Sequence, residues 1–129
     1  MRSAYDYAWL RVMPRLDDGQ LVNVGVIVFA RTRDFLGCAL RPTARVEALL
    51  AAASRTLDVA AVQRHLEAVQ AVCAGAPDAG PIARLPQPER FHWLTAPRST
   101  MIQTSVVHSG LTADPAATLA HLEARLSSS

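Results

Sequence analysis

The sequence predicts a single α+β domain over residues 1–129, in which an antiparallel sheet of about four strands carries about three helices on one face. Three observations predict this class. The first forty residues hold three strand-like runs separated by polar turns, and the first of these runs has the alternating pattern of a strand. Residues 42–74 carry apolar side chains at three- and four-residue steps, as helices do, and one further strand-like run and one further helix-like run follow. Half of the 129 residues are hydrophobic, which is enough for one core.

The N-terminal third is typical of a three-stranded meander. Residues 5–16 alternate, with Leu10 on one face and Trp9 on the other. Residues 17–20, Asp-Asp-Gly-Gln, predict a hairpin turn, because Asp and Gly tolerate positive φ angles. Residues 35–40 form the third strand. The central strand, residues 21–31, is apolar on most of both faces, with Val22, Val24, Val26, Val28 and Ala30 on one face and Asn23, Gly25, Ile27 and Phe29 on the other.

Two helices follow the meander. The first begins at Pro42 and Thr43, with Thr43 as its expected cap, and Val46 and Leu50 belong to its apolar stripe. The second extends from a capping aspartate, Asp58, to about residue 74. Gly75 is expected to end it, because glycine tolerates the left-handed conformation at a helix C-terminus.

The last third of the chain is expected to hold a loop, a strand and a helix. Residues 75–88 form a long loop rich in Pro and Gly, and residues 99–108 form a fourth strand rich in β-branched side chains. Asp114 caps the final helix, with Pro115 at its first helical position. Residues 127–129 form a frayed tail. The buried face of this helix is Leu119, Leu122 and Leu126.

The composition excludes some classes of function. The formal net charge is only +2, so the strong basic patch of a dedicated nucleic-acid binder is missing. All thirteen basic residues are Arg, whose planar guanidinium suits carboxylate, phosphate or aromatic partners. Cys38 and Cys73 have no metal-ligand spacing and are expected to be reduced, buried thiols, so neither metal nor cofactor is predicted. No apolar run approaches the roughly 18 residues of a membrane span, and we expect a cytoplasmic protein.

A dense group of hydrogen-bonding side chains lies between residues 89 and 108. Arg90 and Arg98 could hold an anion between two guanidinium groups, and His108 could move a proton near neutral pH. The alternative is a loop held by internal hydrogen bonds, with Glu89 paired to Arg90 or Arg98. No residue is assigned a catalytic role. The candidate binding residues of this segment are Arg90, Trp93, Arg98, Ser99, Thr100, Gln103 and His108.

A second candidate surface lies on the first strand. Tyr7, Trp9 and Arg11 share one face, and that face receives Asn23 if the first two strands pair as a hairpin. An aromatic, Arg-bearing sheet face is either a docking surface or the floor under the long loop. Arg11 and Asn23 are therefore candidate binding residues.

Several blocks of the sequence resemble one known family. They are YDYAWLRVMPR, LVNVGVIVFAR, FLG, the long block ERFHWLTAPRSTMIQTSVVHSGL, and the DP pair after it. Together they resemble the bacterial family called domain of unknown function 3037 over nearly the whole chain. The resemblance implies no established activity. It does imply a neighbour, because members are often encoded beside a HipA-like serine/threonine kinase, and this suggests a partner or regulator role.

Three hypotheses follow. The first is a non-catalytic interaction or regulatory module, with a HipA-like kinase as its partner. The second is a small enzyme or a binder of a phosphorylated ligand that uses Arg90, Arg98 and His108. The third, disfavoured by the net charge, is a nucleic-acid binder that uses Arg11, Arg15, Arg31, Arg33, Arg41 and Arg45. Ile27 and Phe29 need a cover on the second face of the sheet, which either the long loop or a second copy of the chain would supply.

Overall fold

The computed structural model describes residues 1–14, 21–54, 57–96 and 101–127. These form five strands and four α-helices. In chain order they are β1 (Ser3–Val12), β2 (Val22–Ala30), β3 (Phe35–Leu40), α1 (Thr43–Ala53), α2 (Val59–Ala74), α3 (Gln87–Thr95), β4 (Ile102–Thr104), β5 (His108–Thr112) and α4 (Pro115–Ser127). Short 3-10 turns, η1 (Arg31–Arg33) and η2 (Ile82–Arg84), precede β3 and α3.

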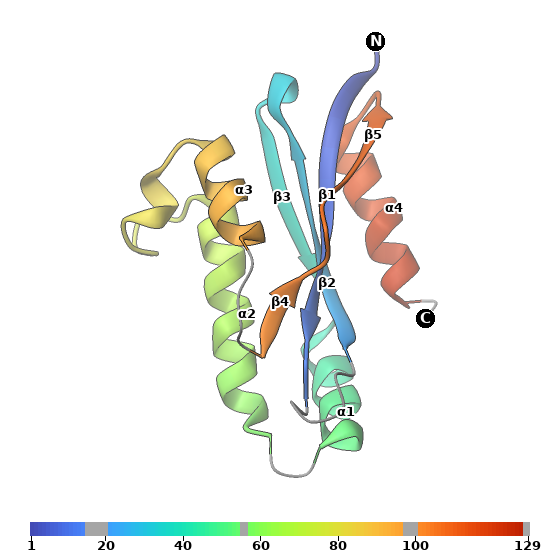
Figure 1. Cartoon of the computed structure of the whole chain (residues 1–129), viewed down its shortest axis with the longest axis vertical. Coiled ribbons are helices and arrows are strands. Elements are labelled where there is room, and N and C mark those ends of the chain that lie inside the picture. The colour runs from blue at the N-terminus through green and yellow to red at the C-terminus, as the bar shows by residue number, and fades with distance from the viewer. Residues whose placement is uncertain (15–20, 55–56, 97–100, 128–129) are drawn as a thin grey trace.

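The strands form one antiparallel sheet in the order β3-β2-β1-β4, and β5 also pairs with β1. The α+β class and the N-terminal meander are confirmed. The helices, however, lie on both faces: α2 and α3 pack on one side of the sheet and α4 on the other (Figure 1). The expectation of helices on one face only is wrong. Its physical cause is the central strand β2, which is apolar on both faces and therefore needs a cover on each.

A β-bulge in β2 changes the predicted faces of that strand. Leu10 lies opposite Gly25 and Arg11 opposite Asn23, so Val24 has no partner on β1. The extra residue reverses the alternation at that point. Val24 packs in the core beneath α1 and α2, whereas Val26 and Val28 pack against α4. The prediction that Val22, Val24, Val26, Val28 and Ala30 share one face is therefore wrong.

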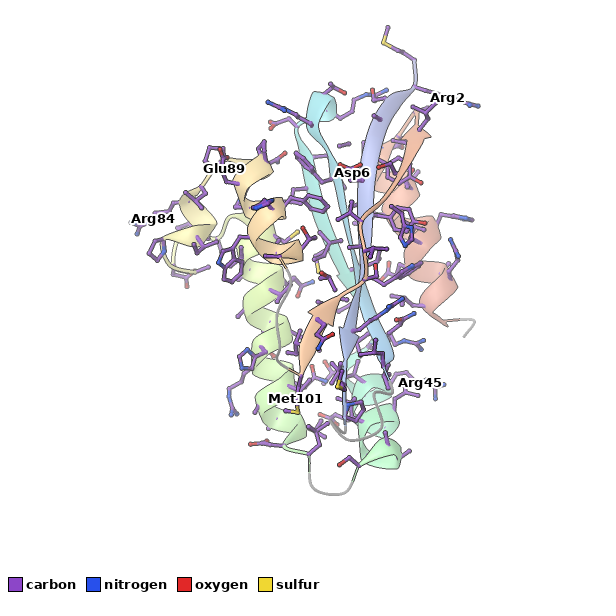
Figure 2. The ribbon with its side chains drawn as sticks, in the orientation of Figure 1. Arg2, Asp6, Arg45, Arg84, Glu89 and Met101 are labelled. Carbon is purple, nitrogen blue, oxygen red and sulfur yellow. The ribbon has the colours of Figure 1, made fainter. Side chains whose placement is uncertain are left out.

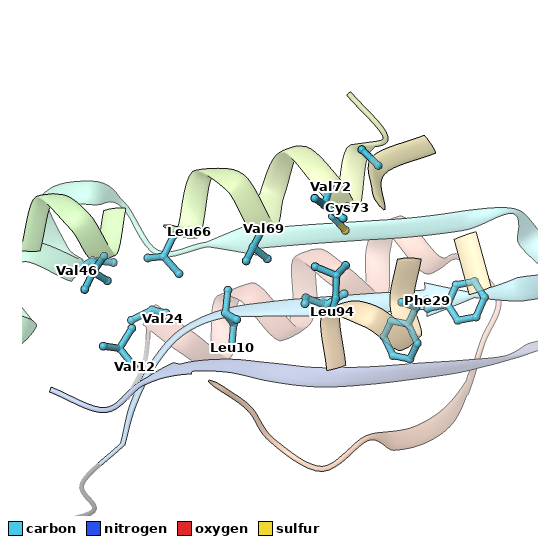
Figure 3. Packing of buried hydrophobic residues seen from close by; sticks show 14 of the residues in the cluster. Leu10, Val12, Val24, Phe29, Val46, Leu66, Val69, Val72, Cys73 and Leu94 are labelled. Carbon is cyan, nitrogen blue, oxygen red and sulfur yellow. The ribbon is translucent and has the colours of Figure 1, made fainter. Parts of the chain in front are cut away.

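The larger core lies between the sheet and α1, α2 and α3 (Figure 3). Ile27 and Phe29 are buried in it, and the Phe29 ring stacks on Phe91 of α3 with 5.1 Å between centroids. These two side chains are thus covered within the chain and need no second copy. The smaller core lies on the other face, where Leu122 and Leu126 of α4 pack against β2.

Four of the five predicted helix boundary residues are confirmed, among them Pro115 as the first residue of α4. The Asp58 carboxylate accepts a hydrogen bond from the Ala61 N–H, and the Asp114 carboxylate accepts one from the Ala116 N–H. Gly75 ends α2 with φ at 68°. Thr43 is not the cap of α1: the helix begins at Thr43, Pro42 occupies the N-cap position, and no side chain caps this end.

Helix α3 is absent from the sequence-based expectation. The predicted loop over residues 75–88 ends earlier, because Gln87 already starts the helix. Only Phe91 and Leu94 of α3 are buried, so its apolar stripe is too short to stand out among polar neighbours.

The predicted fourth strand covers residues 99–108, of which residues 101–108 are described. There the structure has β4 and then the first residue of β5, which continues to Thr112. One more residue separates Thr104 from His108 than separates Tyr7 from Leu10, so a single regular strand cannot pair with β1. Ser105 sits at this irregularity, where its N–H donates to the Trp9 carbonyl and its hydroxyl accepts from the Trp9 N–H.

Two further predictions concern residues outside the described ranges. One is the hairpin turn at residues 17–20. The strands on either side of these residues, β1 and β2, pair antiparallel as expected. The frayed tail is the other: α4 extends to Ser127, and residues 128–129 are not described. None of the helices in the described ranges is long and apolar enough to cross a membrane.

Candidate functional site

Arg90, the first of the predicted anion-binding residues, is engaged with the C-terminus of α2. Its Nη1 lies 3.3 Å from the Val72 carbonyl oxygen and 3.5 Å from that of Cys73, and donates to both. The last carbonyls of a helix lack partners within the helix, so a guanidinium there stabilises its end. The guanidinium also passes so close to Gly75 that a Cβ at that position would collide with Nη1. Arg90 thus serves the packing of α3 on α2.

The other described members of the 89–108 segment lie on α3, on β4 and β5, and between these elements. Trp93 is on α3 and is partly exposed, and Glu89 is exposed at the same helix. Gln103 lies on β4 opposite Arg11 of β1. Arg98, Ser99 and Thr100 lie outside the described residues.

His108 lies on the opposite face of the sheet from Arg90. It pairs with Tyr7 across β1 and β5, and the two ring centroids are 5.2 Å apart. Tyr7 packs against the smaller core beneath α4, whereas Arg90 belongs to the helical layer on the other face. The structure therefore does not bring Arg90 and His108 together. The two residues are far apart because the chain leaves α3 and then follows β1, first as β4 and then as β5 (Figure 1).

The aromatic face of β1 is covered by α4, so it is neither exposed nor the floor under the long loop. Tyr5, Tyr7 and Trp9 pack with Leu122 and Leu126. At the C-terminal end of α4, the Arg125 guanidinium lies 5.4 Å from the centroid of the Trp9 ring.

Arg11 and Asn23 are brought together with a third residue, Arg41. The Arg11 Nε donates to the Asn23 side-chain oxygen at 2.9 Å, and the Arg41 Nε donates to the Asn23 backbone carbonyl at 2.9 Å. These three residues line a surface groove of 420 Å³ together with Leu21, Val22 and Leu49. We call it the arginine groove. Arg11 and Asn23 are candidate binding residues of the sequence, whereas Arg41 is predicted only as one of the six arginines of the nucleic-acid hypothesis.

Arg41 is the buried member of the arginine groove, with 8% of its surface exposed. Burial, and to a smaller extent the positive charge of Arg45, lower the pKa of Arg41. An arginine remains charged even so, because its ordinary pKa lies far above neutrality. The groove therefore places a buried, fixed cation beside the more exposed Arg11. None of the six lining residues belongs to α3. Figure 2 shows Arg45, which lies on α1 like the lining residue Leu49, toward the opposite end of the molecule from Glu89 of α3.

The edge of the sheet beside β1 exposes apolar side chains. Val106 is 76% exposed and Leu111 is 65% exposed, and Val107 between them is also exposed. Within the described residues, β5 pairs with β1 alone, so its other edge carries no strand. We call Val106, Val107, Leu111 and the outer backbone of β5 the β5 edge. Sequence analysis missed it, because a Val-Val pair inside a β-branched run is equally typical of a buried strand.

The two cysteines lie next to each other in the larger core, Cys38 on β3 and Cys73 on α2, and both are free. A hydrogen bond between the two thiols, together with burial, raises the pKa of the Cys73 thiol, while the nearby charge of Arg90 acts in the opposite direction. Among the described residues, His, Cys, Asp and Glu side chains form no group of three that could hold a metal ion.

The raised pKa makes the stability of the protein fall at alkaline pH. The folded chain keeps the Cys73 proton, whereas the unfolded chain releases it above about pH 8.5. The contribution of the protonated Cys73 thiol to the free energy of unfolding is therefore fully present below that pH. It is lost as the pH rises, by up to about 1.4 kcal/mol per pH unit. Urea titrations under reductant between about pH 8.5 and 10 should give a shallower loss of stability for Cys73→Ala than for the unchanged chain. If the free energy of unfolding fell equally steeply with pH in both chains, the raised pKa of Cys73 would be contradicted.

The comparisons with known proteins agree with the resemblance in the sequence. The model of the family described as "Protein of unknown function (DUF3037)" matches residues 7–126. Neither a search of curated proteins nor a search of solved structures finds a match. The match extends from β1 to the last turn of α4 and so includes both helical layers, the arginine groove and the β5 edge. This chain belongs to the DUF3037 family.

Proposed function

We propose that this chain is a non-catalytic interaction module that binds a protein partner along the β5 edge. The observation that carries the proposal is the exposure of Val106, Val107 and Leu111 on one segment at the side of the sheet. Apolar side chains gathered on a surface are costly in water and are typical of a binding surface. The edges of natural sheets are usually protected by charge, proline or a covering segment.

The geometry of β5 suits the addition of a strand by the partner. Its inner edge pairs with β1 from Ser3↔Thr112 to Tyr7↔His108, so its outer N–H and C=O groups alternate along the free side. His108, Gly110 and Thr112 face α4, as their β1 partners do, and Leu111 faces the other way. A partner strand could therefore bond to the backbone and bury Leu111 at the same time.

A HipA-like kinase is the partner that we propose. This part of the proposal rests on what the family resemblance implies, namely that members are often encoded beside such a kinase. The β5 edge supplies a surface that such a partner could bind, and its recognition would need no catalytic residue in this chain.

The test is a binding titration of the purified chain with a HipA-like kinase from the same organism, by interferometry or calorimetry. Leu111→Glu should weaken binding by about tenfold or more, because a charge on an edge strand blocks strand addition and must lose its water on docking. The matched control is Leu85→Glu, since Leu85 is also exposed but follows η2 on the other side of the molecule. This control should change the affinity less than about twofold. Equal effects of the two variants, or no binding at micromolar concentrations, would contradict the proposal.

A further inference from the structure

We propose that Cys38 and Cys73 form a reversible oxidation site, at which a hydroperoxide converts the two thiols into a disulfide between β3 and α2. Both thiols are free in the structure. The two residues come from elements that α1 separates in the sequence, so the fold brings them together. The site is independent of the partner-binding proposal, because neither cysteine belongs to the β5 edge.

The two thiols face each other across the boundary between the sheet and α2. Leu36, Cys38 and Leu40 alternate along β3 and pack against the larger core, on the face of the sheet that α2 covers. Cys73 lies in the last turn of α2, and its side chain extends toward the sheet (Figure 3). The two thiols are close enough to be hydrogen-bonded to each other. Thiols in such contact, on facing elements, can be bridged with little backbone movement.

The two cysteines differ in their access to solvent, and this difference gives them different roles. Cys38 is partly exposed, whereas Cys73 is only 2% exposed. A hydroperoxide that arrives from solvent therefore meets Cys38 first. The hydrogen bond with Cys38, together with burial, raises the pKa of Cys73, so Cys73 keeps its proton and is the poorer first nucleophile. Cys38 is thus the residue that the oxidant attacks, and Cys73 is the residue that closes the disulfide.

The chemistry proceeds in two steps, written here for hydrogen peroxide. The Cys38 thiolate attacks one peroxide oxygen, so that an S–O bond forms and the O–O bond breaks. The products are a sulfenic acid on Cys38 and a hydroxide, which takes up the proton that Cys38 lost and becomes water. The Cys73 sulfur then attacks the Cys38 sulfur. The S–S bond forms, the S–O bond breaks, and the departing hydroxide leaves with the Cys73 proton as a second water.

The electrons for this reaction come from the two thiols, which are oxidised together while the peroxide is reduced. The nearby positive charge of Arg90 favours the thiolate form of Cys73 and so assists the second step. A thiol reductant reverses the reaction by exchange with the disulfide.

The disulfide would join β3, the strand at one end of the sheet, to the C-terminal turn of α2. The crosslink would enclose α1 and nearly all of α2 in a covalent loop. Such a loop restricts the unfolded chain and thereby stabilises the folded one. We expect the melting temperature of the oxidised chain to exceed that of the reduced chain by about 5 to 10 °C.

Intact-mass spectrometry and thiol titration of the full chain, before and after treatment with hydrogen peroxide, test the proposal. The expected product is a monomer that is lighter by about 2 Da, because both thiol hydrogens are lost, and that has no titratable thiol in denaturant. Reductant should restore both thiols. A product that is heavier by added oxygen, a disulfide-linked dimer, or unreacted thiols would overturn the proposal. This measurement uses the unchanged chain and so does not depend on the folding of any variant.

Two variants test the roles of the cysteines, and circular dichroism confirms that both are folded. In Cys73→Ser, the sulfenic acid on Cys38 should persist and be trapped by dimedone, because its thiol partner is absent. In Cys38→Ser, the buried Cys73 should be oxidised about tenfold or more slowly than Cys38 is in Cys73→Ser. Neither variant should gain melting temperature with peroxide. A gain in either variant, or faster oxidation of Cys73 than of Cys38, would overturn the assignment.

Discussion

We expect Leu66→Ala to lower the free energy of unfolding by about 3 kcal/mol, measured by urea denaturation. Leu66 is 1% exposed and lies in the larger core, where α2 faces the sheet. Truncation to alanine removes buried methyl groups and leaves a cavity that the surrounding side chains fill only in part.

The matched control for this variant is Leu111→Ala, the same substitution on the β5 edge. Leu111 is 65% exposed, so its truncation should change the stability by about 0.5 kcal/mol or less. If the two variants lost similar stability, the assignment of α2 to the core and of Leu111 to the surface would be wrong.

Gly25→Ala is expected to destabilise the protein by about 3 kcal/mol, because it overfills the centre of the sheet. A Cβ at Gly25 would lie 2.8 Å from the Ala39 backbone oxygen and 2.8 Å from a Leu40 methyl group. The Ala39 carbonyl belongs to β3, which is bonded to β2 along its length, so it cannot move away freely. Thermal and urea unfolding of the variant measure the loss.

Gly110→Ala is the control for overfilling, since Gly110 also lies in a strand. The three atoms nearest to a Cβ there all belong to the outer end of the Tyr5 ring, at 2.8 to 2.9 Å. Tyr5 is only partly buried, so its ring can turn aside, and the loss should stay below about 1 kcal/mol. A loss in Gly110→Ala as large as in Gly25→Ala would show that the close contact with the β3 backbone is not the cause.

Much of the fold could be predicted because local signals coincide with the final structure. The strand at residues 35–40 and the helix that starts after Asp58 and ends before Gly75 have the predicted bounds. In each case a periodic apolar pattern is bounded by residues that stop it for a stereochemical reason. The close approach to Gly25 was also foreseeable, because a glycine inside a strand often marks such a contact.

The incorrect predictions share a physical cause, which is the pairing of strands that are distant in the sequence. The bulge that turns Val24 away from Val26 depends on how β2 pairs with β1, and the break at Ser105 depends on how β4 and β5 pair with the same strand. The two-residue periodicity of side chains in a strand does not show where that strand has an extra residue, or bulge, relative to its partner. The helical layer on the second face could not be predicted for a related reason. The apolar residues of α4 are evident in the sequence, but which face of the sheet they cover depends on the tertiary fold.

Only part of the candidate site could be predicted from the sequence. Arg11 and Asn23 could be joined because they flank the same hairpin, but the contact of Arg41 with Asn23 spans 18 positions of sequence. The group from Arg90 to His108 is dense in sequence, but its ends lie on different elements: Arg90 is on α3 and His108 is on β5, with β4 between them. The exposure of Val106 and Leu111 depends on which strand lies at the sheet edge, and the sequence pattern does not determine strand order.

The proposal of a partner-binding edge is tested most directly by amide hydrogen exchange of the chain with and without the HipA-like kinase that we propose as its partner. Binding at the β5 edge predicts slower exchange at residues 106–111, whose outer backbone groups would gain hydrogen bonds, and little change along the exposed face of α2. Slower exchange along α2 with unchanged exchange at residues 106–111 would contradict it.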